Sequence, residues 1–203
     1  MNLFSNLFKG NTNKNKSKDE LGDEQSKFMP KTKVAIEERF IIKFIENGGK
    51  FLYSESYNEL NENLGLILKE NSWTNDDILI TKNKIKSNYK LPNSLKINQN
   101  KSKCFITDCE NLIADDGSIL ISSNQIEENS LSDFPENLIV ISDTTKFKNN
   151  IGEGLTEIKS KSKKIPSNIT TIKNFHISKE KDFLSYGTNA KNLYLILLEK
   201  GTI

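Results

Sequence analysis

The chain of 203 residues has one arginine, one histidine and two cysteines. Its 29 basic and 27 acidic side chains nearly cancel, and Arg39 is the single residue with a planar guanidinium for bidentate phosphate binding. A net charge of +2 gives no field for holding a nucleic-acid backbone. No apolar run approaches the roughly 20 residues that cross a bilayer. We therefore expect no nucleic-acid partner and no membrane span.

The two cysteines, Cys104 and Cys109, form a single C-x4-C pair. Structural zinc sites and iron–sulfur clusters usually need four ligands, so this pair cannot fill one alone. The only histidine, His176, lies far away in the sequence, and no nucleophile-elbow motif accompanies it. We expect two reduced thiols on or beside a buried strand, no metal or cofactor in this chain, and no identifiable catalytic residue. Reduced thiols and the lack of a secretory-signal pattern indicate the cytoplasm.

The apolar share of the chain is low, which predicts that part of it is unpacked. Residues 10–33 are a run of polar and charged residues that cannot offset the entropy of ordering. We predict a flexible N-terminal tail over residues 1–33 and one domain over residues 34–203. Within the tail, Leu3, Phe4, Leu7 and Phe8 would share one helical face, which leaves docking and disorder both open.

Helices are predicted from apolar periodicity and from their end signals. Apolar residues recur at helical spacing over residues 36–45, and Asn47-Gly48-Gly49 ends this helix because glycine adopts the left-handed conformation without a clash. Ser56 with Glu59 is a capping-box pair that opens a second helix.

Short apolar runs predict strands through the rest of the chain. They lie at residues 50–53, 78–80, 103–107, 118–122, 138–142, 169–175 and 193–198. The last run is apolar on both faces, as expected for a central strand covered by helices. Alternating helices and strands predict an α/β fold with a mostly parallel sheet flanked by helices.

Three further segments complete the predicted order of elements. Asp108 is expected to cap a brief helical turn reaching Ile113. The apolar positions from Phe147 to Ile158 predict a helix with Thr144 or Thr145 as its cap. Residues 82–101 are polar and are predicted to be irregular.

The most informative segment for a binding site is the acidic turn Asp115-Asp116-Gly117-Ser118. Gly117 permits a tight turn, so that backbone amides could face a ligand, although such a pair of carboxylates more often only caps and solvates a turn. If strands 103–107 and 118–122 are neighbours, further polar residues gather there. These residues are Thr107, Asp108, Ser122, Ser123 and Asn124. Ligands in open α/β sheets favour the carboxyl ends of strands, so we predict a small polar pocket from these nine residues.

Residues 104–124, CFITDCENLIADDGSILISSN, resemble the LUD domain of lactate-utilisation proteins, in particular the small C-type subunits. That family shows a strand, a short helix, an alanine, an acidic residue, a small residue, a glycine, a hydroxyl residue and an apolar strand. The positions that fill this pattern are Ala114, Asp115, Gly117 and Ser118, and Asp116 replaces the usual threonine.

The resemblance extends over roughly residues 34–200, with Pro135 ahead of a core strand and residues 193–198 as the closing strand. Residues 165–175, IPSNITTIKNF, resemble a variant typical of Bacteroidetes-type bacteria. C-type subunits usually carry Gly-Pro-Ser-Arg and His-Gly-Pro motifs near this end. This chain has neither, so the resemblance carries over no ligand site from those motifs.

The resemblance implies a layered α/β fold like that of the NagB/RpiA/CoA-transferase group. It also implies an accessory role beside iron–sulfur subunits that oxidise L-lactate to pyruvate, with electron transfer done by those partners. It transfers no catalytic residue. We expect such a subunit to bind its partner subunits and a small anionic metabolite. The alternative is a stand-alone metabolite-binding protein or metabolic enzyme on the same fold.

Overall fold

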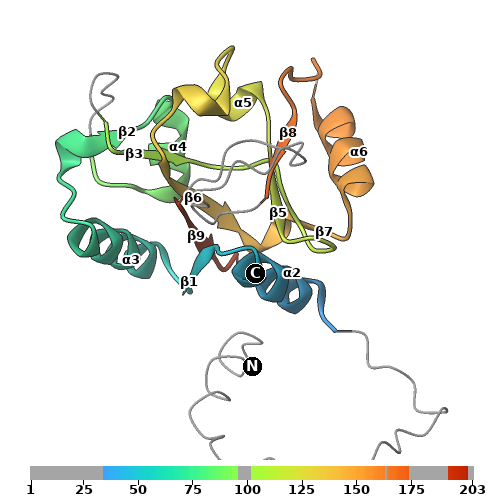
Figure 1. Ribbon diagram of the computed structural model, residues 1–203, viewed down its shortest axis with the longest axis horizontal. Coiled ribbons are helices and arrows are strands. Elements are labelled where there is room, and N and C mark those ends of the chain that lie inside the picture. The colour runs from blue at the N-terminus through green and yellow to red at the C-terminus, as the bar shows by residue number, and fades with distance from the viewer. Residues whose placement is uncertain (1–33, 96–101, 163, 174–191, 201–203) are drawn as a thin grey trace, which may run out of the picture. The chain divides into compact units, whose positions relative to one another are not determined.

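The computed structural model describes residues 34–95, 102–162, 164–173 and 192–200 (Figure 1). All of them except Val34 belong to one compact unit, Ala35–Ile203. The predicted tail over residues 1–33 and the histidine at position 176 lie outside the described residues. Within the described ranges, no helix combines the length and the apolar composition needed to cross a bilayer.

Helices and strands alternate along this unit, as the sequence predicts. The α-helices are α2 (Ile36–Glu46), α3 (Tyr57–Glu70), α4 (Asn83–Tyr89), α5 (Ser123–Ile126) and α6 (Ile151–Lys161). The strands are β1 (Lys50–Ser54), β2 (Ile78–Leu79), β3 (Cys104–Thr107), β4 (Asn111–Ile113), β5 (Ser118–Ile121), β6 (Asn137–Asp143), β7 (Phe147–Lys148), β8 (Thr170–Ile172) and β9 (Asn192–Leu198). Three 3-10 turns, Asn75–Asp77, Leu131–Asp133 and Thr144–Lys146, lie between them.

The main sheet has five parallel strands in the order β1-β9-β6-β3-β2. The apolar strand β9 lies between β1 and β6, and six of its seven residues are buried, which confirms its predicted central position. A strand that is apolar on both faces needs other elements packed against both sides of its sheet, and in parallel sheets helices supply this cover. The fold is therefore the predicted α/β class with a mostly parallel central sheet flanked by helices.

One face of the main sheet packs against α3 and α4. Alternate residues of β3, β6 and β9, among them Ile106, Ile139 and Ile196, form a single buried cluster with Leu64 of α3 and Ile85 of α4. This alternation follows from the two-residue period of a strand. On the opposite face of β3, Phe105 stacks on Phe134, with their ring centroids 4.3 Å apart.

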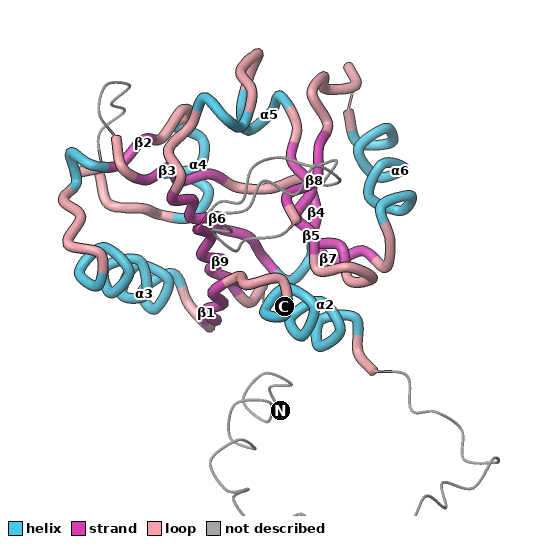
Figure 2. The backbone as a smooth tube through the Cα atoms, in the orientation of Figure 1, coloured by secondary structure: helices cyan, strands magenta, loops and turns pink. Residues whose placement is uncertain are grey.

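A smaller mixed sheet, in the order β7-β4-β5-β8, lies beside the main one (Figure 2). Its β4 and β5 form an antiparallel hairpin, and Ile158 of α6 packs against Ile113 and Leu120 on one of its faces. Helix α2 connects the two sheets, since it contacts β1 and β7, with the ring of Phe40 5.4 Å from that of Phe147.

Several local predictions are confirmed. The Ser56 hydroxyl accepts a hydrogen bond from the Glu59 amide and caps α3. Gly48 adopts φ +88° directly after α2, the left-handed conformation that glycine tolerates. Both cysteines are free and buried, on β3 and directly after it.

Other local predictions are wrong. The segment after Asp108 forms strand β4 instead of a helical turn, because β5 and β7 supply backbone partners on both sides. Phe147 belongs to β7, so α6 begins only at Ile151 and is capped by Asn150, not by Thr144 or Thr145. Part of the segment predicted to be irregular is helix α4.

Candidate functional site

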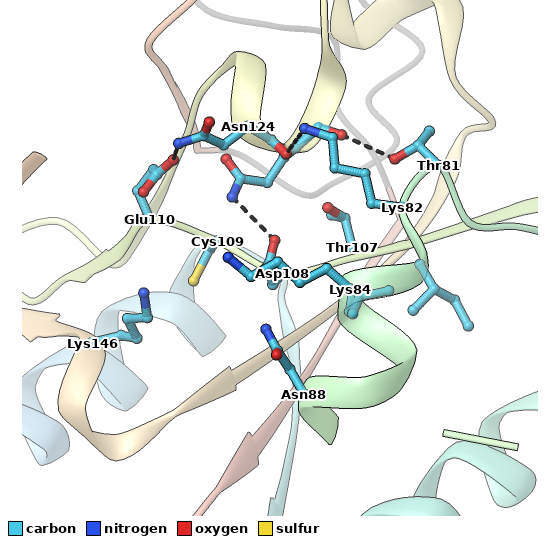
Figure 3. Close-up of a pocket in the computed structure, with 13 residues that line it drawn as sticks. Thr81, Lys82, Lys84, Asn88, Thr107, Asp108, Cys109, Glu110, Asn124 and Lys146 are labelled. Atoms are coloured by element: carbon cyan, nitrogen blue, oxygen red, sulfur yellow. Dashed lines mark hydrogen bonds between the residues drawn. The ribbon is translucent and has the colours of Figure 1, made fainter. Parts of the chain in front are cut away.

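A pocket of about 340 Å³ lies at the carboxyl ends of β2 and β3 (Figure 3). Its wall comes from the loop after β2 and the start of α4, from the loop after β3, from α5, and from the turn after β6. We name it the carboxyl-edge pocket. It is lined by Thr81, Lys82, Lys84, Ile85 and Asn88, by residues 106–110, by Asn124 and Gln125, and by Lys146.

Parallel strands explain why residues far apart in sequence meet here. β2, β3 and β6 are adjacent in the main sheet, and all three run in the same direction. Their carboxyl ends therefore lie at one edge, which is where ligands bind in open α/β sheets. Each loop that leaves this edge brings polar side chains to the same place.

The loop after β2 is fastened to α5 across the pocket. The Thr81 hydroxyl donates a hydrogen bond to the Gln125 carbonyl at 3.3 Å. The Lys82 ammonium donates to the carbonyls of Ser123 and Asn124. These contacts hold the Lys82 ammonium group in place, and within the described residues no carboxylate pairs with it, so it both shapes the pocket and adds positive charge to its wall.

Asp108 follows β3 and lies in the middle of the lining. One of its oxygens accepts a hydrogen bond from the Gln125 side-chain amide at 3.1 Å. Burial raises the pKa of the Asp108 carboxyl, and the Gln125 hydrogen bond and the charge of Lys146 only partly oppose this shift. A carboxyl group with a raised pKa in a polar pocket is a feature that functional sites share.

The two neighbours of Asp108 have structural partners. Burial raises the pKa of the Cys109 thiol to about 12, and its sulfur donates a hydrogen bond to the Ser142 hydroxyl at 3.3 Å. A protonated, buried thiol is a poor nucleophile. The Glu110 carboxylate accepts hydrogen bonds from the Ser122 hydroxyl at 2.6 Å and the Asn124 amide at 2.8 Å. Both residues therefore stabilise the wall of the pocket.

Positive charge exceeds negative charge in the lining. Lys82, Lys84 and Lys146 all contribute ammonium groups, against the carboxylates of Asp108 and Glu110. Within the described ranges, ion pairs are formed by other lysines, and none involves these three. In Figure 3, Lys82 and Asn124 lie above Asp108, Asn88 lies below it, and Lys146 lies to its left. The arrangement suits an anionic ligand.

The nine residues predicted for a site separate into two groups. Thr107, Asp108 and Asn124 line the carboxyl-edge pocket. Ser122 and Ser123 lie directly behind its wall, as the cap and first residue of α5. The remaining four, Asp115 to Ser118, lie at the tip of the β4–β5 hairpin. Strands β3 and β5 belong to different sheets, so the condition under which all nine residues would gather in one place is not met.

The acidic turn is bound to other parts of the chain. The amides of Asp115, Gly117 and Ser118 donate hydrogen bonds to Asn149, Ile113 and Asp116, respectively. Gly117 has φ +69°, and a Cβ atom there would lie 2.5 Å from the backbone of α2. The amides that were expected to face a ligand therefore close the turn.

Ion pairs and hydrogen bonds complete this junction. The Arg39 guanidinium of α2 pairs with Asp115 at 3.3 Å and donates to the Asn149 side chain at 2.6 Å. The Asn47 amide donates to the Asp116 carbonyl at 2.7 Å, and Lys173 pairs with the Asp116 carboxylate. The turn thus fixes α2 to the smaller sheet.

No group of three or more histidine, cysteine, aspartate or glutamate residues within the described part of the chain is arranged to hold a metal ion.

Sequence reasoning missed the lysines and Asn88 of the pocket. Ile85 and Tyr89 are apolar at a spacing of four, the signal of a short helix, and Lys84 and Asn88 have the same spacing on that helix. Thr81 and Lys82 follow a predicted strand, so the rule that selected Thr107 and Asp108 would have selected them too. No sequence pattern identified Lys146 as a residue of the pocket.

Comparisons with known proteins agree with this fold. The family model of the LUD domain matches residues 36–198 of the chain. A crystal structure of a DUF162 family protein from Deinococcus radiodurans is similar, with a TM-score of 0.55 and 10% sequence identity. The match covers 81% of this chain and 96% of that one. The search of curated proteins finds no significant match. Because the family model spans most of the chain, the protein belongs to the LUD domain family.

Proposed function

We propose that this LUD-domain protein is an accessory subunit of an L-lactate-oxidising system and binds a small organic anion in the carboxyl-edge pocket. In this role the chain binds iron–sulfur partner subunits, which carry the electrons from lactate to their acceptor. The proposal assigns no redox centre to this chain.

The charge of the pocket supports anion binding. Three ammonium groups face two carboxylates there, and burial disfavours the charged form of one of these carboxylates, Asp108. The ammonium groups of Lys84 and Lys146 have no ion-pair partner in the described part of the chain. A bound carboxylate or phosphate would supply that partner through charge-assisted hydrogen bonds. This unbalanced set of lysines is the observation that carries the proposal.

The cysteine content of the chain supports the assignment of electron transfer to partner subunits. A cubane or rhombic cluster needs four protein ligands, usually thiolates. The chain has two cysteines, and burial raises the pKa of both. Electron transfer during lactate oxidation is therefore assigned to the partners.

One observation favours a second candidate, a metabolic enzyme that acts alone. A carboxyl group with a raised pKa in a polar pocket, as at Asp108, is suited to donate or accept a proton. Turnover of a ligand by the purified chain alone, abolished in Asp108→Asn, would favour this alternative over the accessory role.

Ligand binding can be tested by thermal unfolding of the full chain with lactate, pyruvate or a phosphosugar added at constant ionic strength. We expect at least one anion to raise the melting temperature. The rise should shrink several-fold in Lys84→Gln and Lys146→Gln. Lys69→Gln is the matched control, since Lys69 is exposed on α3 and lies away from the pocket. No rise with any anion, or an equal rise in all variants, would refute binding in the pocket.

The accessory role has its own test. The purified chain is mixed with iron–sulfur lactate-utilisation subunits from the same source and analysed by size-exclusion chromatography. Elution of all subunits in one peak, with lactate oxidation dependent on the chain, is expected. Separate elution, with lactate oxidised equally well without the chain, would refute the role.

A further inference from the structure

The lining of the carboxyl-edge pocket carries more positive than negative charge. Lys82, Lys84 and Lys146 carry three positive charges. Glu110 supplies a negative charge that is held in place by hydrogen bonds from Ser122 and Asn124. Asp108 supplies a second negative charge only in its ionised form, which burial in a low-dielectric environment opposes. The lining therefore has an excess of one to two positive charges.

The pocket is also large enough for more than a three-carbon acid. Its volume of about 340 Å³ falls within the range of roughly 300–1,000 Å³ that is typical of small-molecule sites. A pocket of this size admits a ligand larger than lactate.

The polar groups of the lining are spread over several elements. Lys84 and Asn88 come from one turn of α4, and Lys146 comes from the turn that follows β6. Because β3 lies between β2 and β6 in the sheet, these two sources of charge lie on either side of the loop that carries Asp108. Donors arranged in this way can contact two acidic groups of one ligand.

We infer that the carboxyl-edge pocket prefers a short-chain dianion, with two negative charges on a dicarboxylate or a phosphate monoester, over a monocarboxylate such as lactate. This inference rests on the proposed function, because it specifies the anion that the same pocket binds. Lys84 and Lys146 contact the acidic groups. Lys82 adds charge from the wall, since the carbonyls of Ser123 and Asn124 hold its ammonium group there.

A substitution at Asp108 tests whether charge controls affinity in the pocket, because a purely structural pocket would show no such dependence. An ionised Asp108 repels a dianion more strongly than it repels a monoanion. Asparagine at this position keeps a side-chain oxygen to accept the Gln125 hydrogen bond and removes the charge. Asp108→Asn should therefore bind the dianion at least as tightly as the unmodified chain does.

The experiment is isothermal titration calorimetry of the full chain at pH 7.5 and fixed ionic strength. Malate is compared with lactate, since the two differ by one added carboxylate group. Glycerol 3-phosphate is compared with glycerol, so that the two arms distinguish a dicarboxylate from a phosphate monoester. We expect a dianion in at least one arm to bind ten-fold or more tightly than lactate. Lys84→Gln and Lys146→Gln should each reduce that ratio several-fold, and Asp108→Asn should not reduce it.

The results distinguish the preference for a dianion from anion binding itself. If lactate binds as tightly as both dianions and still depends on Lys84 and Lys146, the dianion preference is refuted and the proposed anion pocket stands. If neither lactate nor a dianion binds, or binding is unaffected by Lys84→Gln and Lys146→Gln, both are refuted. Weaker dianion binding by Asp108→Asn, in a variant that melts at the same temperature as the unmodified chain, would also refute the charge argument.

Discussion

Replacing Gly117 by alanine should loosen the junction between α2 and the smaller sheet. The residue has φ +69°, a conformation that costs an L-amino acid about 1–2 kcal/mol relative to glycine. Its new Cβ atom would also lie 2.5 Å from the Lys43 carbonyl carbon and 2.5 Å from the Phe44 amide nitrogen. These are backbone atoms of α2, so the helix itself must move.

The expected loss follows from these two contributions. Overpacking of a well-packed contact typically costs about 1–3 kcal/mol. Together with the conformational cost, Gly117→Ala should lower the free energy of unfolding by about 2–5 kcal/mol. Complete release of α2 would cost more, because Phe40, Ile41 and Phe44 are buried and each contributes about 1.5–3 kcal/mol. We therefore expect a shifted helix in a folded protein.

The assay is urea unfolding followed by circular dichroism, with the free energy taken from the midpoint and the slope. Gly65→Ala is the matched control, because Gly65 lies inside α3 with nothing within 4 Å of a Cβ atom. This control should gain up to about 1 kcal/mol from helix propensity. Gly117→Asn separates the two costs, since asparagine tolerates the left-handed region but keeps the clash. Unchanged stability in Gly117→Ala would refute the packing described for this turn.

Two further predictions concern titratable groups. Burial alone would raise the pKa of Glu157, but hydrogen bonds from Lys161 and Asn111 and the charge of Lys148 lower it to about 2. Because the folded-state pKa lies below the ordinary 4.5, the stabilisation is present above that pH and is lost as the pH falls towards 2. In unfolding experiments, Glu157→Gln should reduce the loss of unfolding free energy as the pH falls from 4.5 towards 2. The same loss in the variant and the unmodified chain would contradict the assignment. Cys109 is buried and its thiol pKa is raised to about 12, so a thiol reagent at pH 7.5 should label it only after denaturation. Rapid labelling of the native chain would contradict its buried position in the loop after β3.

Much of the fold could be predicted from strong local signals in the sequence. The strand β9 could be predicted because its apolar residues continue over both faces, a pattern that only a doubly covered strand tolerates. The start of α3 could be predicted because Ser56 and Glu59 interact within one turn, independently of the rest of the fold. Such signals depend on neighbours in the sequence, so they survive without a structure.

The elements that were missed depend on distant partners. Residues 111–113 are too few to show a clear period, and they form a strand because β5 and β7 lie on either side. A useful signal was present nevertheless. Asp116-Gly117 stands between two apolar runs, which is a typical hairpin turn. Read in this way, the acidic turn would have been placed at a hairpin tip, away from the carboxyl ends of the main strands.

The pocket shows why a motif search finds so little in this chain. Lys84 follows β2, Asp108 follows β3, and Lys146 follows β6, so each one taken alone resembles an ordinary surface charge. Their combination arises only from the order β6-β3-β2 in the sheet, which places three loops side by side. The turn at Gly117 is not part of that edge because β4 and β5 belong to the other sheet. Strand order, more than any contiguous sequence, therefore determines where polar side chains gather in this LUD domain.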